Sequence, residues 1–103
     1  MESQKEISRS VYLTISEIDT KFDAFAKPLD KTFKKERTRL NKIIDRAILN
    51  GDKKRKENAR LTLSKFTKSY YSKRKRKHQY LIKSICAKNG RSENHIRTVA
   101  GWH

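Results

Sequence analysis

The 103-residue sequence has little of three residue types that shape many small proteins: it contains one cysteine, one proline and three glycines. Cys86 has no cysteine partner, which excludes an intramolecular disulfide and favours a reducing compartment. So few glycines and prolines argue against a turn-rich sheet protein. Lys, Glu, Leu, Ile, Arg and Ala at helical spacings instead predict an all-α protein, a small helical bundle of three to five helices.

Long hydrophobic runs are also missing. No apolar stretch approaches the roughly 18 residues of a membrane-spanning helix, and the N-terminus lacks the basic-then-apolar pattern of a signal peptide. We therefore expect a soluble, cytoplasmic and nucleoid-associated protein without a membrane partner, or a nuclear one in a eukaryotic host. Apolar residues make up only 34% of the chain, so its core must be thin. An oligomer or a partner is one way to complete such a fold.

The residues that catalysis requires are scattered or absent. Residues 61–90 contain no aspartate or glutamate, whereas a nuclease needs clustered acids to hold its metal ions. The chain has no paired carboxylates, no nucleophile motif and no phosphate-binding glycine loop. His78, His95 and His103 do not have metal-ligand spacing with the single cysteine. We predict no enzymatic activity, no cofactor and no metal, and we predict that Cys86 is buried packing.

The sequence is rich in positive charge, and this charge is unevenly distributed. It has 27 Lys and Arg against 11 Asp and Glu, a formal net charge of +16. Residues 1–30 hold four cations and six acids, whereas residues 31–103 hold 23 cations and five acids. Cations at this density repel one another unless a polyanion neutralises them. Nucleic acid is the expected partner because neutralising its phosphates releases condensed counterions.

The predicted phosphate contacts fall in three clusters. Consecutive cations on a helix point to different sides, which favours contact with the nucleic-acid backbone over base reading. Tyr70, Tyr71 and Tyr80 flank the third cluster and are candidates for stacking on unpaired bases, although aromatic residues at helical spacing are more often core. The clusters are Lys34, Lys35, Arg37 and Arg39; Lys53, Lys54, Arg55 and Lys56; and Lys73, Arg74, Lys75, Arg76 and Lys77.

The first predicted segment, residues 1–29, is an amphipathic helix. Its apolar residues recur at steps of three and four, which places them on one stripe. The stripe either packs on other helices of the chain or forms a homodimer or protein-partner contact. Pro28 is expected to end or kink this helix at about Ala26 or Lys27. The stripe comprises Ile7, Val11, Ile15, Ile18, Phe22, Phe25 and Leu29.

The second predicted segment, residues 30–72, is a basic helical hairpin. Asp30 is a candidate N-cap for a helix over residues 31–49. The following Asn-Gly-Asp sequence favours a turn, because Gly51 can adopt the left-handed conformation and Asp52 can cap the next helix. Two helices joined in this way form an antiparallel pair.

From residue 53 to residue 89 the chain has no glycine or proline. The apolar stripe of this stretch is interrupted across residues 73–77. One explanation is a single long helix with a polar band, and the other is a break in the helix. We expect a break or bend near residues 72–78.

The third predicted segment, residues 73–103, ends in two short amphipathic stretches separated by Gly90. Ile96 and Val99 follow this glycine by six and nine positions, and Cys86 precedes it by four. A helix-turn-helix has a small residue in its first helix, a glycine in the turn and two apolar residues that seat its second helix. Ser92 is a candidate cap for that second helix.

Over residues 81–102 this spacing resembles the helix-turn-helix segments of bacterial and phage DNA-binding regulators. A plain helix end followed by a short tail helix is the alternative, and Trp102 is expected to fold back and close a small core. Asparagine and arginine suit contacts to adenine and guanine. The resemblance implies a base-reading face of Ser92, Glu93, Asn94, Arg97 and Thr98, with Arg91 and His95 near the nucleic-acid backbone.

Together these features predict one domain that binds nucleic acid without catalysis, most simply duplex DNA, in a regulatory role of bacterial or mobile-element type. One alternative is an RNA-binding or ribosome-associated helical protein, which reads structured RNA by shape. The other is a basic inhibitor or adaptor that docks on an acidic or nucleic-acid-binding protein, with the N-terminal stripe as its partner helix.

Overall fold

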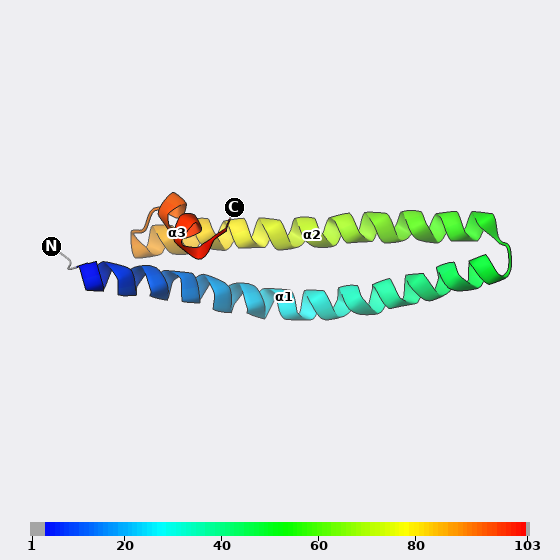
Figure 1. Cartoon of the computed structure of the whole chain (residues 1–103), viewed down its shortest axis with the longest axis horizontal. Helices are drawn as coiled ribbons and strands as arrows, with labels where there is room; N and C mark the ends of the chain where they lie inside the picture. Colours follow the sequence, from blue (N-terminus) through cyan, green and yellow to red (C-terminus); the bar gives the residue numbers. More distant parts are fainter. Residues whose placement is uncertain (1–3, 103) are drawn as a thin grey trace. The chain divides into compact units, whose positions relative to one another are not determined.

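The computed structural model describes residues 4–102, with side chains from residue 7. It contains three helices, α1 (Gln4–Leu49), α2 (Lys53–Asn89) and α3 (Glu93–Ala100), as Figure 1 shows. No strand occurs in this described part of the chain. The prediction of an all-α protein is confirmed.

The chain divides into two compact units. The three-helix unit comprises the described residues 4–25 and 75–102, which are the beginning of α1, the end of α2 and the whole of α3. The hairpin unit comprises residues 26–74, which are the remainder of α1 and α2 with the turn that joins them. Residues from the first and third predicted segments thus share one unit.

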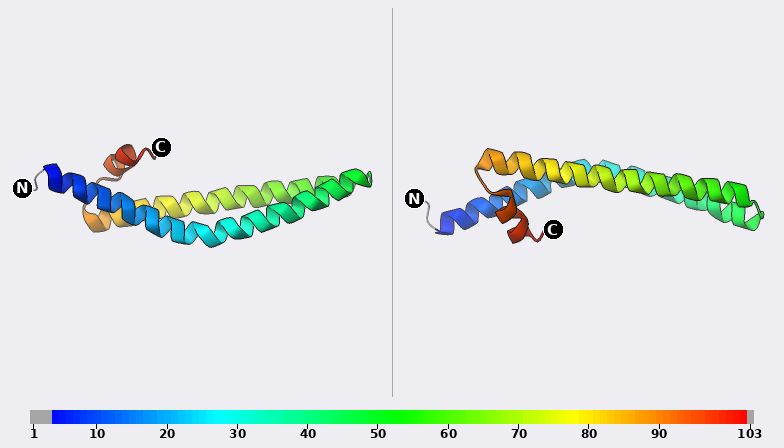
Figure 2. Two further views of the ribbon diagram at one scale, coloured as in Figure 1. Left: turned by 60° about the horizontal axis from the view of Figure 1, so that its bottom comes forward. Right: turned by 90° about the horizontal axis from the view of Figure 1, so that it is seen from above.

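The core of the three-helix unit draws side chains from all three helices. The α1 stripe supplies Val11 and Ile18, and α3 supplies Ile96, which belongs to the same buried cluster. Figure 2 shows α3, in red, close to the end of α2. Trp102 lies against this cluster, so the prediction that it folds back is confirmed. The stripe therefore packs within the chain. The buried residues of the cluster are Val11, Ile18, Leu81, Ile82, Ile85, Cys86 and Ile96.

The hairpin unit has a narrower core, in which alanines hold half of the buried apolar positions. Phe33 is its largest buried side chain, and its ring stacks on Tyr70 at a centroid distance of 3.9 Å and on Phe66 at 5.6 Å. Small residues allow the two helices to approach closely over a narrow contact. The buried apolar residues of this unit are Ala26, Phe33, Leu40, Ile44, Ala47 and Ala59.

The turn between α1 and α2 matches the sequence prediction. Gly51 adopts a φ of 68°, and its N–H donates to the carbonyl of Ile48 at 3.2 Å. The N–H of Asp52 donates to the carbonyl of Ala47 at 2.9 Å, which completes a Schellman motif. The Asp52 Oδ1 then accepts from the N–H of Arg55 at 3.0 Å and caps α2.

Of the two expectations for Pro28, a helix end or a kink, the helix end is wrong, because α1 continues through this residue to Leu49. An interior proline removes one helical hydrogen bond and costs about 3 kcal/mol. Packing on both sides of Pro28 offsets this cost, since Ala26 is buried and Asp30 is bonded to α2 within the hairpin unit. Asp30 consequently lies inside α1, and its predicted role as an N-cap is also wrong.

The predicted break near residues 72–78 is wrong as well, since α2 is an unbroken helix from Lys53 to Asn89. The basic run crosses the surface of this helix as a polar band. Two of its members turn toward α1: Arg74 pairs with Asp30 in the hairpin unit, and Lys77 lies over the ring of Phe25 in the three-helix unit. These contacts hold the run in a helix where the local sequence supplies no apolar residue.

Candidate nucleic-acid interface

The hairpin unit carries most of the positive charge. Its sequence holds 17 Lys and Arg against five Asp and Glu, whereas the three-helix unit holds ten against six. Two of the three predicted phosphate-binding clusters, and part of the third, lie on the hairpin unit. Nearly all of its cations are exposed, and only Lys56 and Arg74 are half-buried. This unit therefore presents the strongest candidate surface for a polyanion.

The first cluster lies along α1 and is exposed throughout. Lys34 and Lys35, with Lys31 and Thr38, line a shallow cleft of about 420 Å³ on the outer side of the helix. The other two members contact neighbouring side chains. Arg37 lies over the ring of Phe33 with its Cζ 5.5 Å from the centroid. Arg39 pairs with Glu36, and this pairing holds the pKa of the Glu36 carboxyl below its usual range.

The second cluster occupies the first turn of α2. Lys53, Lys54 and Arg55 are exposed and Lys56 is half-buried. No acid lies in this first turn, so the positive end of the helix dipole meets four cations and only the cap at Asp52 opposes them. Each cation at such an end costs about 0.3–1 kcal/mol at low salt. A phosphate bound here would offset this repulsion.

The third cluster is divided between contacts inside the protein and the surface. Arg74 is bonded to Asp30, and the Nζ of Lys77 lies 5.4 Å from the centroid of the Tyr80 ring as well as over Phe25. The remaining members, Lys73, Lys75 and Arg76, are exposed. The run therefore offers three of its five cations to a partner.

Asp30, Tyr70 and Arg74 form a polar cluster, the Asp30 cluster, that joins α1 to α2 in the hairpin unit. The Asp30 Oδ1 accepts from the Tyr70 hydroxyl and from Arg74 Nη1, which also donates to the Tyr70 hydroxyl at 3.1 Å. Arg74 and then Tyr70 lower the pKa of the Asp30 carboxyl. Burial, followed by the bond to Asp30, raises the pKa of the Tyr70 hydroxyl. Local sequence patterns do not predict this cluster, because Asp30 lies 40 residues before Tyr70 and 44 residues before Arg74.

The three tyrosines near the third cluster differ in accessibility. Tyr70 is half-buried against Phe33, so it serves the fold. Tyr71 is exposed in the hairpin unit, with its ring edge toward Phe33, and Tyr80 is exposed in the three-helix unit. Of the three candidates for base stacking, Tyr71 and Tyr80 present accessible rings.

The turn before α3 has the local geometry that its sequence predicts. Gly90 has a φ of 64°, and the N–H of Arg91 donates to the carbonyl of Cys86 at 2.8 Å. Ser92 precedes α3 with an extended backbone, and its Oγ accepts from the N–H of His95 at 3.4 Å. The predicted turn and cap are both confirmed, and so is the burial of Cys86.

The residues of α3 divide into a seated side and an exposed side. Ile96 is fully buried, but Val99 is 55% exposed, so the expectation that both seat the helix is wrong for Val99. Arg97 is half-buried, and its positive charge, after burial, lowers the pKa of His78.

Of the predicted base-reading residues, Arg97 is half-buried, and the exposed ones are Ser92, Glu93, Asn94 and Thr98. Of the two residues predicted near the nucleic-acid backbone, Arg91 is half-buried and His95 is exposed. The Thr98 hydroxyl donates to the carbonyl of Asn94 at 2.8 Å, within the helix. None of the exposed base-reading residues is thus a cation, and Glu93 among them is an acid. This side of α3 contributes little to the attraction of a polyanion.

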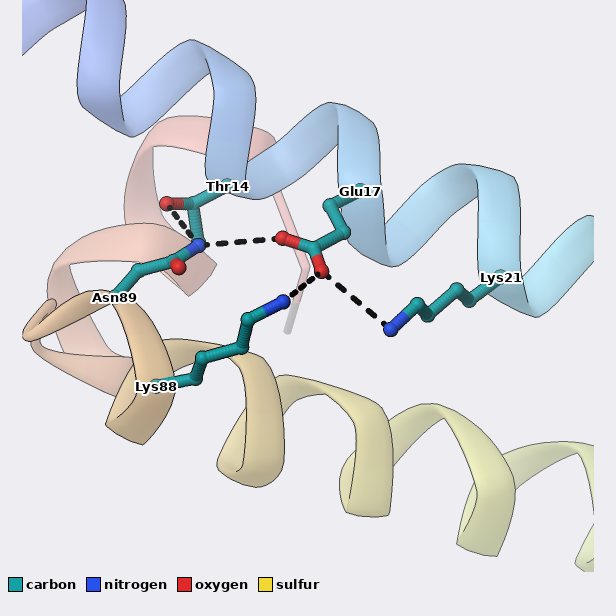
Figure 3. A network of polar contacts seen from close by, with 5 residues as sticks. All are labelled: Thr14, Glu17, Lys21, Lys88 and Asn89. Carbon is teal, nitrogen blue, oxygen red and sulfur yellow. Dashed lines mark hydrogen bonds and ion pairs between the residues drawn. The ribbon is translucent and has the colours of Figure 1, made fainter.

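A polar network joins α1 to the end of α2 in the three-helix unit (Figure 3). Glu17 accepts from Lys88 Nζ at 3.0 Å and pairs with Lys21 at 3.4 Å. Asn89 Nδ2 donates to the hydroxyl of the buried Thr14 at 3.1 Å. The bond from Lys88 is the main cause of the lowered pKa of Glu17. The network fixes the helix end that precedes the Gly90 turn.

The predicted dimerisation stripe leaves a small apolar surface. Val11, Ile15 and Ile7 line a cleft of about 310 Å³ together with His95 and Val99 of α3. Val11 and Ile18 are buried, and Phe22 and Phe25 are half-buried. Most of the stripe is therefore covered within the chain.

Comparison of the chain with protein-family models, curated proteins and solved structures found no match. Across residues 7–102, no three or more His, Cys, Asp or Glu side chains are grouped so that they could hold a metal ion, and the prediction about His103 falls outside the described residues. Between residues 4 and 102, no helix has both the length and the apolar character to span a membrane.

Proposed function

We propose that this protein binds nucleic acid without catalysis, and that its hairpin unit contacts the phosphates of duplex DNA. The observation that carries the proposal is the 17 cations against five acids in residues 26–74, nearly all of the cations exposed. Each phosphate neutralised by Lys or Arg releases counterions, which drives binding without reading sequence. A regulatory role of bacterial or mobile-element type remains part of this proposal.

Exposed cations lie on the outer sides of both helices of the hairpin unit. The proposed contact with phosphates therefore does not require the protein to enter one particular groove of the DNA. Lys35 and Lys42 lie on α1, and Lys54, Lys65 and Lys68 lie on α2, all of them exposed. A surface of this kind fits a phosphate backbone on either side of the hairpin. Structured RNA is the second candidate, favoured by the same distribution, because RNA helices are bound mainly through shape and phosphates.

The helix-turn-helix resemblance of residues 81–102 has a secondary place in the proposal. In this role, α3 would present Asn94 and Thr98 to base edges. The local turn and the exposure of these two side chains support this role. The half-buried Arg97 limits it to few contacts.

The test compares two variants that remove the same charge from different units. Lys35→Gln with Lys42→Gln removes two exposed cations of the hairpin unit, and Arg9→Gln with Lys83→Gln removes two exposed cations of the three-helix unit. Binding of a fluorescein-labelled duplex is measured by anisotropy across a salt series. We expect the slope of log K against log salt to fall by about 1.8 for the hairpin pair and to stay unchanged for the control.

Equal losses for the two pairs would mean that the charge attracts polyanions without a defined surface, and would overturn the proposal. The same series with a structured RNA of equal phosphate number decides between the two nucleic acids. Tighter binding of RNA than of duplex at every salt concentration would select the second candidate.

A further inference from the structure

The turn of the hairpin unit exposes two aliphatic side chains in the middle of its positive charge. Leu49, the last residue of α1, is 84% exposed and Ile48 beside it is 52% exposed. Single exposed aliphatic residues are common on protein surfaces, whereas Ile48 and Leu49 are two exposed aliphatic residues that follow each other at one helix end. The turn itself does not require them, because its hydrogen bonds are made by the backbone.

Cations flank this apolar pair in the sequence of both helices. Arg46 in the last turn of α1 is exposed, and α2 begins with Lys53, Lys54, Arg55 and Lys56. A cleft of about 180 Å³ lies here, with Ala47 and Ile48 among its apolar lining and with Asp52, Lys53 and Lys56 as its charged lining. We call Arg46, Ile48, Leu49 and residues 53–56 the hairpin tip.

A ligand that matches this surface has apolar faces beside regularly spaced negative charges. Nucleic acid has both, but the faces of its bases are stacked in an intact duplex, where the apolar group offered in the major groove is the thymine methyl. Aliphatic side chains that enter DNA do so between unstacked bases. A base that is unpaired or has lost its stacking neighbour would therefore fit the tip better than an intact duplex.

We propose that the hairpin tip recognises a discontinuity in duplex DNA, such as a bulge or a gap, by packing Leu49 and Ile48 against an exposed base face. The cations of the tip hold the phosphates on either side of that base. The inference rests on the proposed function and adds to it a preferred structure of the nucleic acid.

An anionic membrane surface also combines negative charge with an apolar layer, but the rest of the hairpin unit favours nucleic acid. Lys65 and Lys68 lie 12 and 15 residues along α2 from Lys53, which is roughly 18 and 22 Å. The electrostatic field of a membrane decays over about 8 Å in physiological salt. Exposed cations that continue this far from the tip fit a polymer that runs along the helices.

The experiment uses the full chain and two labelled DNA duplexes of the same length, one intact and one with a three-nucleotide bulge. Leu49→Ser removes the most exposed aliphatic side chain of the tip and leaves every buried residue in place. Leu61→Ser is the matched control, because Leu61 is a 52% exposed leucine of the same unit that lies outside the tip. Affinities are measured by anisotropy, and 2-aminopurine in the bulge reports base stacking.

We expect the unaltered protein to bind the bulged duplex about tenfold more tightly than the intact one, a factor in keeping with the burial of one leucine. Leu49→Ser should abolish this preference and its 2-aminopurine change, while Leu61→Ser keeps both. Loss of the preference in both variants would show that the tip is not the site.

Equal binding of the two duplexes by the unaltered protein would overturn the tip proposal and leave the proposed function intact. Absence of binding to either duplex would refute both. Binding to vesicles of phosphatidylserine that Leu49→Ser abolishes, without a bulge preference, would assign the tip to a membrane instead.

Discussion

The three-helix unit contains the large side chains that are fully buried, whereas the hairpin unit carries most of the charged side chains and a narrower core. Among the described residues, the large side chains that are fully buried, such as Ile18, Ile82 and Ile96, all belong to the three-helix unit. The hairpin unit holds 17 of the 27 cations and buries three alanines among its six core residues. The same two helices thus provide a stable core at one stretch and a charged surface at another.

This difference shows how a chain with few apolar residues can fold and still present a dense positive charge. Mutual repulsion of cations weakens a compact state, and a narrow core offsets less of it. The hairpin unit adds the Asp30 cluster and the stack of Phe33 on Tyr70 to its alanine contacts. We infer that its stability depends on salt and on bound polyanion more than that of the three-helix unit.

The largest effect is expected from the same substitution made in both units. Ile82→Ala, at a fully buried position, should lower the free energy of unfolding by about 4 kcal/mol, and Ile44→Ala, at a less sealed position, by about 2 kcal/mol. Urea denaturation followed by circular dichroism measures both. An equal or larger loss for Ile44→Ala would show that the hairpin unit has the tighter core and would reverse the comparison.

A smaller effect is expected from Asp30→Asn, which removes the charge that Arg74 and Tyr70 share. The melting temperature should fall, whereas Asp45→Asn, which removes an exposed charge from the same unit, should change it less. The folded pKa of Asp30 lies below its ordinary value, so its contribution is present above that value and is lost as the pH falls through the lowered pKa.

The difference in melting temperature between the unaltered protein and Asp30→Asn should therefore persist at neutral pH and close in acid. A difference that stays constant down to the most acidic pH at which the protein is folded would argue against the charged interaction. In that case the Asp30 cluster would act through packing alone.

The smallest effect is expected on the pH dependence of stability, through His78 in the three-helix unit. The centroid of the His78 ring lies 5.0 Å from that of Phe22 and 4.6 Å from that of Trp102. Burial and then the charge of Arg97 lower the pKa of His78. The unfolded chain therefore binds a proton first, at about pH 6.5, and stability falls from there toward the lowered folded pKa.

His78→Phe should flatten this dependence of the melting temperature between pH 7.5 and the lowered pKa, whereas His95→Gln, at an exposed position, should keep it. An unchanged slope in His78→Phe would assign the pH dependence to other groups. The salt dependence of the hairpin unit would then be the main response of the protein to its solution conditions.

Local sequence signals predicted the features that depend on neighbouring residues. The turn at Gly51 and the cap at Ser92 follow from the conformational preferences of glycine and from the hydrogen-bonding reach of serine, and both are present. The stripe that contains Val11 and Ile18 followed from helical periodicity, and it packs within the chain. Local sequence therefore predicted these two helix ends and the part of the three-helix core that α1 supplies.

Features that depend on distant residues were not predictable in this way. Pro28 and the run at residues 73–77 are local signals for an interruption, but each helix is held by contacts such as Arg74 with Asp30, which lie 44 residues apart in sequence. The 84% exposure of Leu49 at the end of α1 was not predicted either. The hairpin tip became visible only when the end of α1 was placed.

Trp102 gives the protein an intrinsic optical reporter of one unit. It is the single tryptophan of the sequence, and its ring packs beside His78 in the three-helix unit. Tryptophan emission therefore follows the unfolding of that unit, while circular dichroism follows the helices of both. If tryptophan emission and circular dichroism changed at different denaturant concentrations, the unfolding of the two units could be distinguished without any label.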